Sequence, residues 1–233
     1  MNNPHPIDAR PLITGDDPAA QAHYQQLVAE YGSPLLVLNR RVLQARFKAL
    51  QAALPEVDLY YAVKAHPDPE IIKIIDQLGG GFDIASAGEM SLLLDHKVSG
   101  RRTIHTHPIT KDQEIRDGLR FGATTFVIDN AHELKKLVPY RSRVGVLLRV
   151  SFRSASAIVD LSKKFGCAPD EVADLVQQAN ALGIHVKGLS FHVGSQCNDA
   201  SKHVEAITRC HALMQDINTC LLYTSPSPRD KCR

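Results

Sequence analysis

A lysine at the end of an apolar run is the first residue of this chain with a distinctive chemistry. Lys64 directly follows Tyr60-Tyr61-Ala62-Val63. If this run is a buried strand, loss of water around the ammonium group favours the neutral amine, a nucleophile that forms Schiff bases with carbonyl compounds. The alternative is a lysine at a strand end that simply reaches solvent. Position alone leaves both interpretations open.

A second candidate is the run His192-Val193-Gly194-Ser195, which follows the strand-like residues GLSF. A Gly-Ser turn at a strand end offers backbone N–H groups and a hydroxyl to a phosphate. The flat imidazole of His192 could stack on an aromatic ring. The alternative is a histidine in an ordinary loop, with no ligand.

Charged residues also end other strand-like runs. Asp83 and Glu89 are two carboxylates six residues apart, and they could orient a cation such as Arg149. Acidic side chains also favour the first turn of helices, so Glu89 could instead be a helix cap.

The pair His105 and His107 suggests an opposing hypothesis, a metal-dependent barrel hydrolase. Such enzymes place two histidines on one strand and further ligands on later strands, here His192. Both histidines would have to face the inside of the sheet, and Lys64 would have no role. We therefore predict that the chain has no metal site.

The elements that position these residues follow a regular alternation. Before it, we predict a helix ending at Tyr31, a short buried strand at 35–38 and a helix over 40–54. Amphipathic segments then separate strand-like runs at 58–64, 81–86, 103–108, 124–129, 145–150 and 188–194. Alternating strands and helices imply a parallel sheet with helical crossovers.

Six consecutive units without a glycine-rich dinucleotide-binding motif favour a (β/α)8 TIM-type barrel over an open doubly wound sheet. A complete barrel has eight such units, so the predicted fold is a barrel truncated after about six. The step from the fifth run to the sixth is longer than the others, and we expect its extra segment, 151–167, to lie over the active site.

The end of the chain differs in character. CLLYTSPSPRDKCR contains two Ser-Pro pairs and no periodicity. We predict that 219–233 is a non-native tail, with a flexible native terminus as the alternative. The predicted division is an N-terminal extension and helix at 1–32, an incomplete barrel at 33–218, and this tail.

Composition limits the partners. The 233 residues carry 27 Lys and Arg against 25 Asp and Glu, a net charge of +2, with 44% apolar residues. This balance argues against nucleic acid or a membrane as a partner, and no apolar run could span a bilayer. The five irregularly spaced cysteines predict neither a disulfide scaffold nor a structural zinc site, and they favour a reducing cytoplasmic location.

Six segments together resemble a known family. In this order and spacing they are YYAVKAHPDP, GFDIASAGE, THPITK, LLRVS, LSKKFG and GLSFHVGSQ. They resemble the fold-type III pyridoxal-phosphate-dependent decarboxylases, the class that acts on ornithine, lysine, diaminopimelate and arginine, and most closely the ornithine decarboxylase group. The similarity runs from about residue 32 to about residue 216. It implies an alanine racemase-like N-terminal barrel, followed in family members by a C-terminal β-domain that is absent here.

The resemblance also implies roles for individual residues. Lys64 would hold the cofactor, pyridoxal 5′-phosphate, covalently. His192 would stack on its pyridine ring and act in catalysis, and Gly194 with Ser195 would bind its phosphate.

Other residues would complete the pocket. Arg149 would lie near the ring, with Asp83 and Glu89 as supporting acids, and Phe165-Gly166 would belong to a mobile loop over the site. One departure is His66, where the family often has asparagine, which puts local hydrogen bonds in doubt.

The implied parent is a homodimeric decarboxylase that converts L-ornithine to putrescine and CO2 in polyamine biosynthesis. Lysine/ornithine or diaminopimelate decarboxylase are the alternatives. An inactive regulator of this family would lack the lysine that is present at Lys64. Family members complete the site with later residues, so we expect this chain alone to be inactive.

Overall fold

The computed structural model describes residues 18–152, 164–194, 197 and 199–224. The chain divides into two compact units. One comprises Met1–Tyr61 and Ala65–Gly81, and the other comprises Ala62–Lys64 and Phe82–Arg233. Lys64 therefore belongs to the second unit, with the rest of the candidate site.

The first unit contains three helices, α1 (Pro18–Tyr31), α2 (Arg40–Ala53) and α3 (Pro69–Gln77), and most of strand β1 (Tyr60–Ala62). The sequence starts α2 and α3 with recognisable caps. Asn39 Oδ1 accepts the Val42 N–H at 3.1 Å before α2, and Asp68 Oδ1 accepts the Glu70 N–H at 2.8 Å before α3. Such side-chain acceptors satisfy N–H groups that have no partner within the helix.

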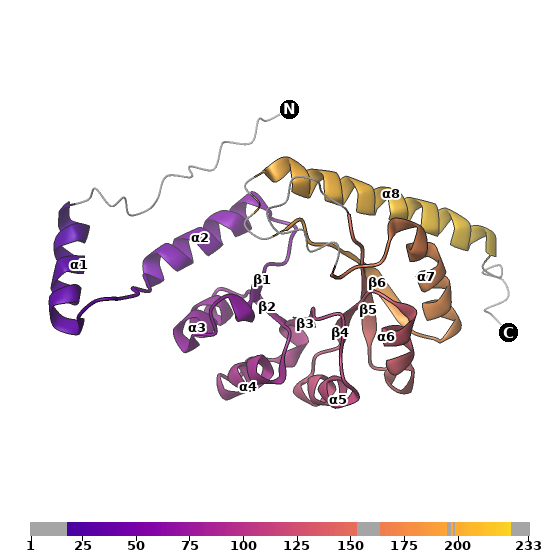
Figure 1. Ribbon diagram of the computed structural model, residues 1–233, viewed down its shortest axis with the longest axis horizontal. Coiled ribbons are helices and arrows are strands. Elements are labelled where there is room, and N and C mark those ends of the chain that lie inside the picture. The colour runs from indigo at the N-terminus through magenta and orange to yellow at the C-terminus, as the bar shows by residue number, and fades with distance from the viewer. Residues whose placement is uncertain (1–17, 153–163, 195–196, 198, 225–233) are drawn as a thin grey trace. The chain divides into compact units, whose positions relative to one another are not determined.

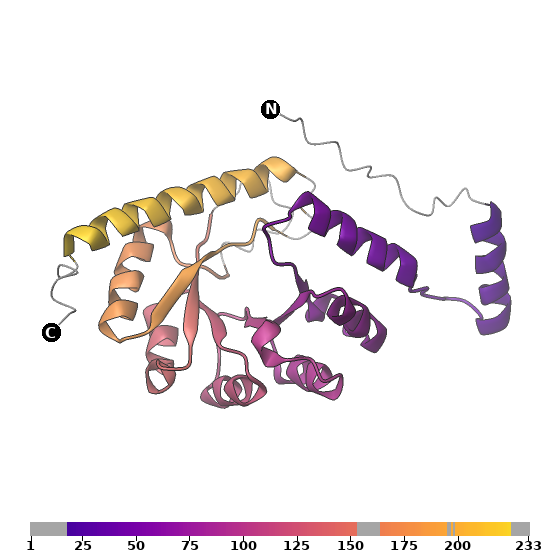
Figure 2. The ribbon, with the colours of Figure 1, turned by 180° about the vertical axis from the view of Figure 1, so that it is seen from behind.

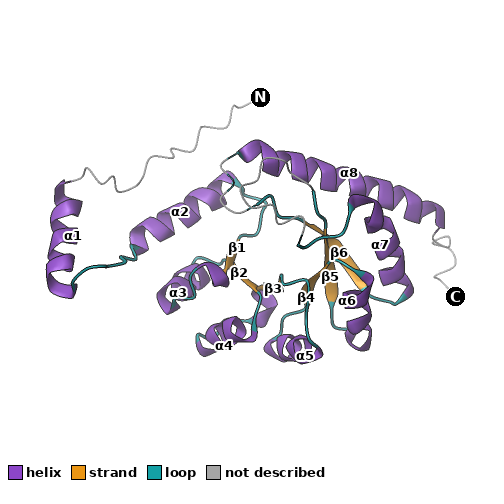
Figure 3. Cartoon of the chain, in the orientation of Figure 1, coloured by secondary structure: helices purple, strands orange, loops and turns teal. Residues whose placement is uncertain are grey.

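The strand predicted at Leu35–Leu38 is not present. These residues form an extended loop between α1 and α2 (Figure 3), and the Leu36 side chain is 84% exposed. An apolar run becomes a buried strand only if a neighbouring strand takes up its N–H and C=O groups. The described residues offer no such neighbour here.

The second unit is built from alternating strands and helices (Figure 1, Figure 2). Its strands are β2 (Gly81–Ile84), β3 (Thr103–His105), β4 (Thr125–Ile128), β5 (Gly145–Arg149) and β6 (His185–Ser190). Its helices are α4 (Ala87–Asp95), α5 (Asp112–Phe121), α6 (Ala131–Lys136), α7 (Val172–Ala181) and α8 (Ala200–Thr224). Short 3-10 turns are η1 (Val63–Ala65), η2 (Gly100–Arg102), η3 (Val138–Tyr140) and η5 (Pro169–Glu171).

The strands form a six-stranded sheet in chain order, from β1 to β6. The pairs from β2–β3 to β5–β6 are all parallel. A barrel adds strands in chain order, whereas a doubly wound sheet reverses direction at a switch point. The α/β parallel sheet and its order confirm the predicted barrel-type fold.

Helices cover one face of this sheet. Phe126, Val146 and Leu148 are at most 1% exposed and share a core with Ile115 of α5 and Leu134 of α6. Residues in register on neighbouring parallel strands share a face, and successive residues alternate between faces. Asp83 and Arg149 alternate with the buried Ile84 and Leu148, so they lie on the face opposite the helices.

Helix α8 was absent from the prediction, and it continues through residues 219–224 of the predicted tail. A recognisable signal precedes it, because Asp199 Oδ1 accepts the Ser201 N–H at 2.9 Å. In the described part of the chain, no helix combines the length and apolar character needed to cross a membrane.

Candidate active site

Lys64 lies at the carboxyl end of β1, in the turn η1. Its side chain is exposed, whereas the neighbouring Val63 is fully buried. Of the two interpretations that position left open, the structure agrees with the lysine that reaches solvent, because the chain leaves the strand at Val63 and Lys64 is exposed. The amine is open to reaction with a carbonyl compound, and its charge acts on the carboxyl group of Asp83.

Asp83 occupies the second strand on the face opposite the helices. Thr106 Oγ1 donates a hydrogen bond to Asp83 Oδ1. Burial raises the pKa of Asp83, and the nearby Glu89 charge adds to the rise, while the Thr106 hydrogen bond and the charges of Lys64 and Arg149 oppose it. This acid is therefore electrostatically linked to two of the cations predicted for the site.

Glu89 caps helix α4. Its Oε2 accepts the Ala85 N–H at 2.8 Å, and its Oε1 accepts the Ser86 hydroxyl at 3.1 Å. In return, Ser86 Oγ accepts the Glu89 N–H at 3.3 Å, as the side chain of an N-cap residue does. The helix-cap interpretation is confirmed, and a direct role for Glu89 in cofactor binding stays a prediction.

Arg149 ends β5 and is half-buried. Burial lowers the pKa of this guanidinium, while the negative charges of Asp129 and Asp83 raise it. The Arg149 Cζ lies 5.3 Å from the centre of the Phe165 ring, within the range of a cation–π interaction. The Phe165 ring also makes an edge contact with the His107 ring, and the two ring centres are 5.6 Å apart.

Phe165 and Gly166 are anchored at the end of the sheet. Asp129 Oδ2 accepts the Gly166 N–H at 2.9 Å, and Arg149 O accepts the Cys167 N–H at 2.9 Å. Cys167 forms an isolated parallel bridge with Val150. The mobile loop that the resemblance implies for the two residues stays a prediction. The segment 153–163, which precedes them, lies outside the described residues.

His192 follows β6 by two residues. Its Nδ1 accepts the Gly194 N–H at 2.9 Å, so in the neutral ring the proton resides on Nε2. Burial lowers the pKa of His192, and the positive charges of Arg149, Lys64 and His203 lower it further. Gly194, two residues after His192, has a φ of 112°, in the left-handed region that favours glycine. Ser195, the predicted phosphate ligand, lies outside the described residues.

The two histidines of the metal hypothesis do not face one site. His105 is 1% exposed, is in register with Ile84 and Phe126 on the helix-covered face, and stacks on Phe126 with ring centres 5.4 Å apart. His107 lies beyond the strand, with Nδ1 2.7 Å from the Ile109 carbonyl oxygen. Among the described residues, no group of three or more His, Cys, Asp or Glu could hold a metal ion.

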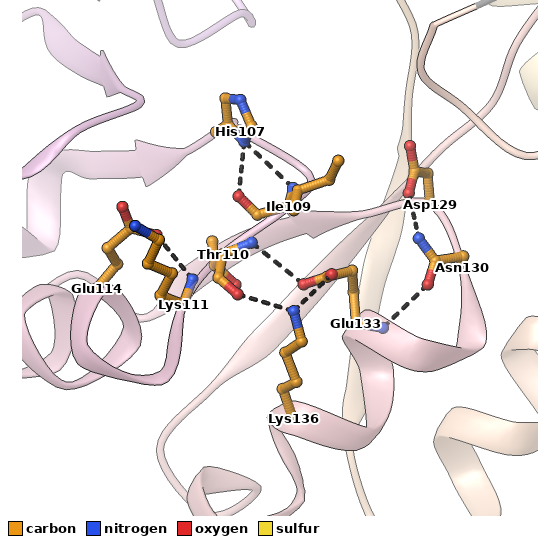
Figure 4. A network of polar contacts seen from close by, with 9 residues as sticks. All are labelled: His107, Ile109, Thr110, Lys111, Glu114, Asp129, Asn130, Glu133 and Lys136. Carbon is orange, nitrogen blue, oxygen red and sulfur yellow. Dashed lines mark hydrogen bonds and ion pairs between the residues drawn. The ribbon is translucent and has the colours of Figure 1, made fainter.

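A buried clamp holds the turn that contains His107 (Figure 4). Glu133 Oε2 accepts the Thr110 N–H at 3.1 Å, and its Oε1 accepts a hydrogen bond from Lys136 Nζ at 2.7 Å. Lys136 Nζ also donates to the Thr110 carbonyl at 2.9 Å. The clamp joins the turn after β3 to helix α6.

Sequence reasoning gave no role in the site to Thr106 or Asp129, and it placed Phe165 only in a loop over the site. Thr106 was detectable in principle, because it follows His105 and alternation directs it to the face of Asp83. The sequence placed Asp129 at the end of a strand, but its hydrogen-bond partner Gly166 is 37 residues away along the chain. The contact of Phe165 with Arg149 depends on the path of the chain after β5 and leaves no local signal.

Lys64, Asp83, Arg149 and His192 thus meet at the carboxyl ends of the strands, where parallel barrels place their active sites. A model of the family "Pyridoxal-dependent decarboxylase, pyridoxal binding domain" matches residues 40–222. The chain belongs to this family. The matched residues include all six strands of the described sheet and most of the described helices.

Relatives of this decarboxylase family share extensive similarity with the chain. The lysine/ornithine decarboxylase of Selenomonas ruminantium is 30% identical over 197 residues, which cover 84% of this chain and 50% of that protein. The ornithine decarboxylase of Schizosaccharomyces pombe is 37% identical over 158 residues, which cover 68% of this chain and 37% of that protein. The chain therefore spans half or less of these relatives.

A solved structure of the same family superposes well. The Vibrio vulnificus lysine/ornithine decarboxylase, solved with cadaverine, gives a TM-score of 0.79 at 40% identity. The superposition covers 86% of this chain and 53% of that one.

The described residues fit pyridoxal phosphate. Lys64 offers an exposed amine, and its positive charge and that of Arg149 both act on His192, so an anionic group here meets favourable charge. His192 has its Nδ1 engaged with the backbone, which fixes the ring orientation next to the glycine turn. Asp83 adds a carboxyl group whose protonation responds to the charge of Lys64.

Proposed function

We propose that this chain is the cofactor-binding part of a pyridoxal-phosphate-dependent amino-acid decarboxylase that converts L-ornithine to putrescine and CO2. The observation that carries the proposal is the electrostatic cluster of Lys64, Asp83, Arg149 and His192 at one end of the sheet, in a chain of this family. Pyridoxal phosphate, when bound, supplies an electron sink for the charge left at the α-carbon after CO2 departs.

Three residues of the cluster have a defined task in this proposal. Lys64 would hold the cofactor through its amine, a nucleophile toward carbonyl groups. The lowered pKa of His192 favours a neutral ring near neutral pH, and a neutral ring can lie flat against an aromatic cofactor without adding a cation to the site. Arg149 supplies fixed positive charge, because it stays protonated despite its lowered pKa.

The choice of ornithine rests on the relatives. One named above is an ornithine decarboxylase and two are lysine/ornithine decarboxylases. The sequence FHVGSQ at 191–196 also favours ornithine over diaminopimelate as the substrate. Lysine is the second candidate substrate, because the Vibrio vulnificus relative was solved with cadaverine, the diamine that decarboxylation of lysine yields.

Further features of the proposal concern the whole protein. By the resemblance, it is a homodimer, and the acid that faces the pyridine nitrogen and the catalytic cysteine come from a part beyond this chain. We therefore propose that the 233-residue chain alone does not release CO2 from ornithine.

The test is an assay of CO2 and diamine release by the full-length protein with pyridoxal phosphate. L-ornithine, L-lysine, L-arginine and diaminopimelate are compared as substrates, and we expect ornithine to give the highest kcat/KM. Lys64→Ala should reduce turnover by about 100-fold or more, since it removes the nucleophile. Lys135→Ala, at an exposed lysine of helix α6, is the matched control and should leave the rate within about twofold. Full activity of Lys64→Ala, or no CO2 from any of the four substrates, would contradict the proposal.

A further inference from the structure

Asp129 occupies the carboxyl end of the fourth strand, next to the candidate site. Both of its carboxylate oxygens have partners. Asn130 Nδ2 donates to Oδ1 at 2.8 Å (Figure 4), and the Gly166 N–H donates to Oδ2 at 2.9 Å. We infer that Asp129 is a positioning residue for Arg149, acting through Phe165-Gly166; this inference rests on the proposed function.

The segment that Asp129 holds is attached to Arg149 through the backbone as well. Arg149 O accepts the Cys167 N–H at 2.9 Å, and Cys167 O accepts the Ser151 N–H at 2.9 Å. Gly166 has a φ of +100°, and a Cβ at this position would lie 2.9 Å from the Ser151 backbone nitrogen. Only glycine fits such a close approach, so the position of Phe165 is narrowly defined.

The Phe165 ring connects the position of this segment to the Arg149 guanidinium, because the two groups are in contact. Its ring centre lies 5.3 Å from Arg149 Cζ and 5.6 Å from the centre of the His107 ring. The face of the aromatic ring attracts the cation, and His107 limits the movement of the ring. Asp129 therefore orients Arg149 through the ring, and its negative charge also acts directly on the half-buried guanidinium.

The consequence concerns cofactor affinity. An arginine that is already held in its binding orientation loses less side-chain entropy when an anion arrives. Without Asp129, the Gly166 N–H loses its acceptor, Phe165 loses its anchor, and Arg149 loses a counter-charge. Pyridoxal phosphate then binds a less ordered guanidinium.

A double-mutant cycle separates this positioning role from a merely structural one. In the full-length protein, the Kd for pyridoxal phosphate is measured for the wild type, Asp129→Ala, Arg149→Gln and the double variant. We expect Asp129→Ala to weaken binding about 10-fold in the wild-type background and less than about twofold when Arg149 is already Gln. Equal losses in the two backgrounds would overturn the inference.

Two further variants test whether Asp129 acts on Arg149 through Phe165. Phe165→Leu keeps an apolar side chain but removes the cation–π contact, so it should give at least half of the Asp129→Ala effect on a logarithmic scale; unchanged binding would overturn the path through Phe165. The matched control is Asp117→Ala on helix α5, whose carboxylate is 3.2 Å from Arg120. The affinity of this control should stay within about twofold of the wild type.

A second cycle does not involve the cofactor. The unfolding equilibrium of the same four cofactor-free proteins reports the coupling of Asp129 with Arg149 directly. Asp129→Ala should raise the unfolding constant about threefold more in the wild-type background than beside Arg149→Gln. If the wild type takes up no pyridoxal phosphate, the proposed function fails. If this second cycle shows no coupling, the inference about Asp129 fails.

Discussion

At the scale of single residues, His105 is the least expected group in the core. Its side chain is 1% exposed, and neither ring nitrogen has a hydrogen-bond partner among the described residues. Leaving a buried polar atom without a partner costs about 1–3 kcal/mol. The stacking on Phe126 compensates only through packing.

The replacement His105→Phe keeps an aromatic ring against Phe126 and removes both unsatisfied nitrogens. We expect it to raise the free energy of unfolding by about 1 kcal/mol. Urea denaturation of the full-length protein measures the difference, with His132→Phe on the exposed side of α6 as the control. A loss of stability in His105→Phe would show that the imidazole has a partner.

The same histidine makes stability depend on pH. Burial lowers the pKa of His105, Glu114 opposes this effect, and the neighbouring His107 adds to it. The folded-state pKa therefore lies below the unfolded value of about 6.5. The stabilising contribution of the neutral ring is complete above about pH 6.5 and decreases as the pH falls below it. His105→Phe should flatten this part of the stability profile, and an unchanged slope would assign it to another group.

At the scale of elements, the clamp around Glu133 joins two consecutive βα units. The Glu133 side chain is 5% exposed, and its ion pair with Lys136 is 2.7 Å long. Removing one partner of a buried pair leaves the other charge and the Thr110 N–H without compensation.

We therefore expect Glu133→Ala to lower the free energy of unfolding by about 3 kcal/mol. Glu114→Ala, which removes only an exposed 2.7 Å acceptor for the Lys111 N–H, should cost about 1 kcal/mol. Thermal unfolding of both variants makes the comparison. Equal costs for the two would mean that the clamp contributes no more than an ordinary helix cap.

The alternation of strands and helices was predictable because each element carries its own period and its own caps. The carboxyl ends of the strands then identified Lys64, Asp83, Arg149 and His192 as neighbours. The strand predicted at Leu35–Leu38 was wrong, because these residues have no strand partner among the described residues. The exposure of Lys64, which follows a buried valine, was left open by the sequence and is decided by the turn after Val63.

Two further features also depend on contacts between residues that are distant in the sequence. Strand β6 begins at His185, three residues before the predicted start, because a bulge beside Val146 and Leu147 lets the polar Lys187 stay within it. The contacts of Asp83 with Thr106 and of Asp129 with Gly166 join residues 23 and 37 positions apart. Strand alternation places Thr106 on the face of Asp83, but no local pattern identifies the pair of Asp129 and Gly166.

At the scale of the whole molecule, the sheet has two ends in the described part of the chain, β1 and β6. Strand edges with free N–H and C=O groups pair readily with other chains. We expect the 233-residue chain alone to self-associate in sedimentation experiments, while the full-length protein gives one defined species. A monodisperse monomer of the short chain would contradict this expectation.

The central claim, that Lys64 binds pyridoxal phosphate covalently, is tested most directly by chemical trapping. The full-length protein is incubated with pyridoxal phosphate, reduced with borohydride, digested and mapped by mass spectrometry. We predict one reduced pyridoxyl phosphate group, on Lys64, and none in Lys64→Ala. A protein that retains no label, or that is labelled equally after Lys64→Ala, would contradict the account.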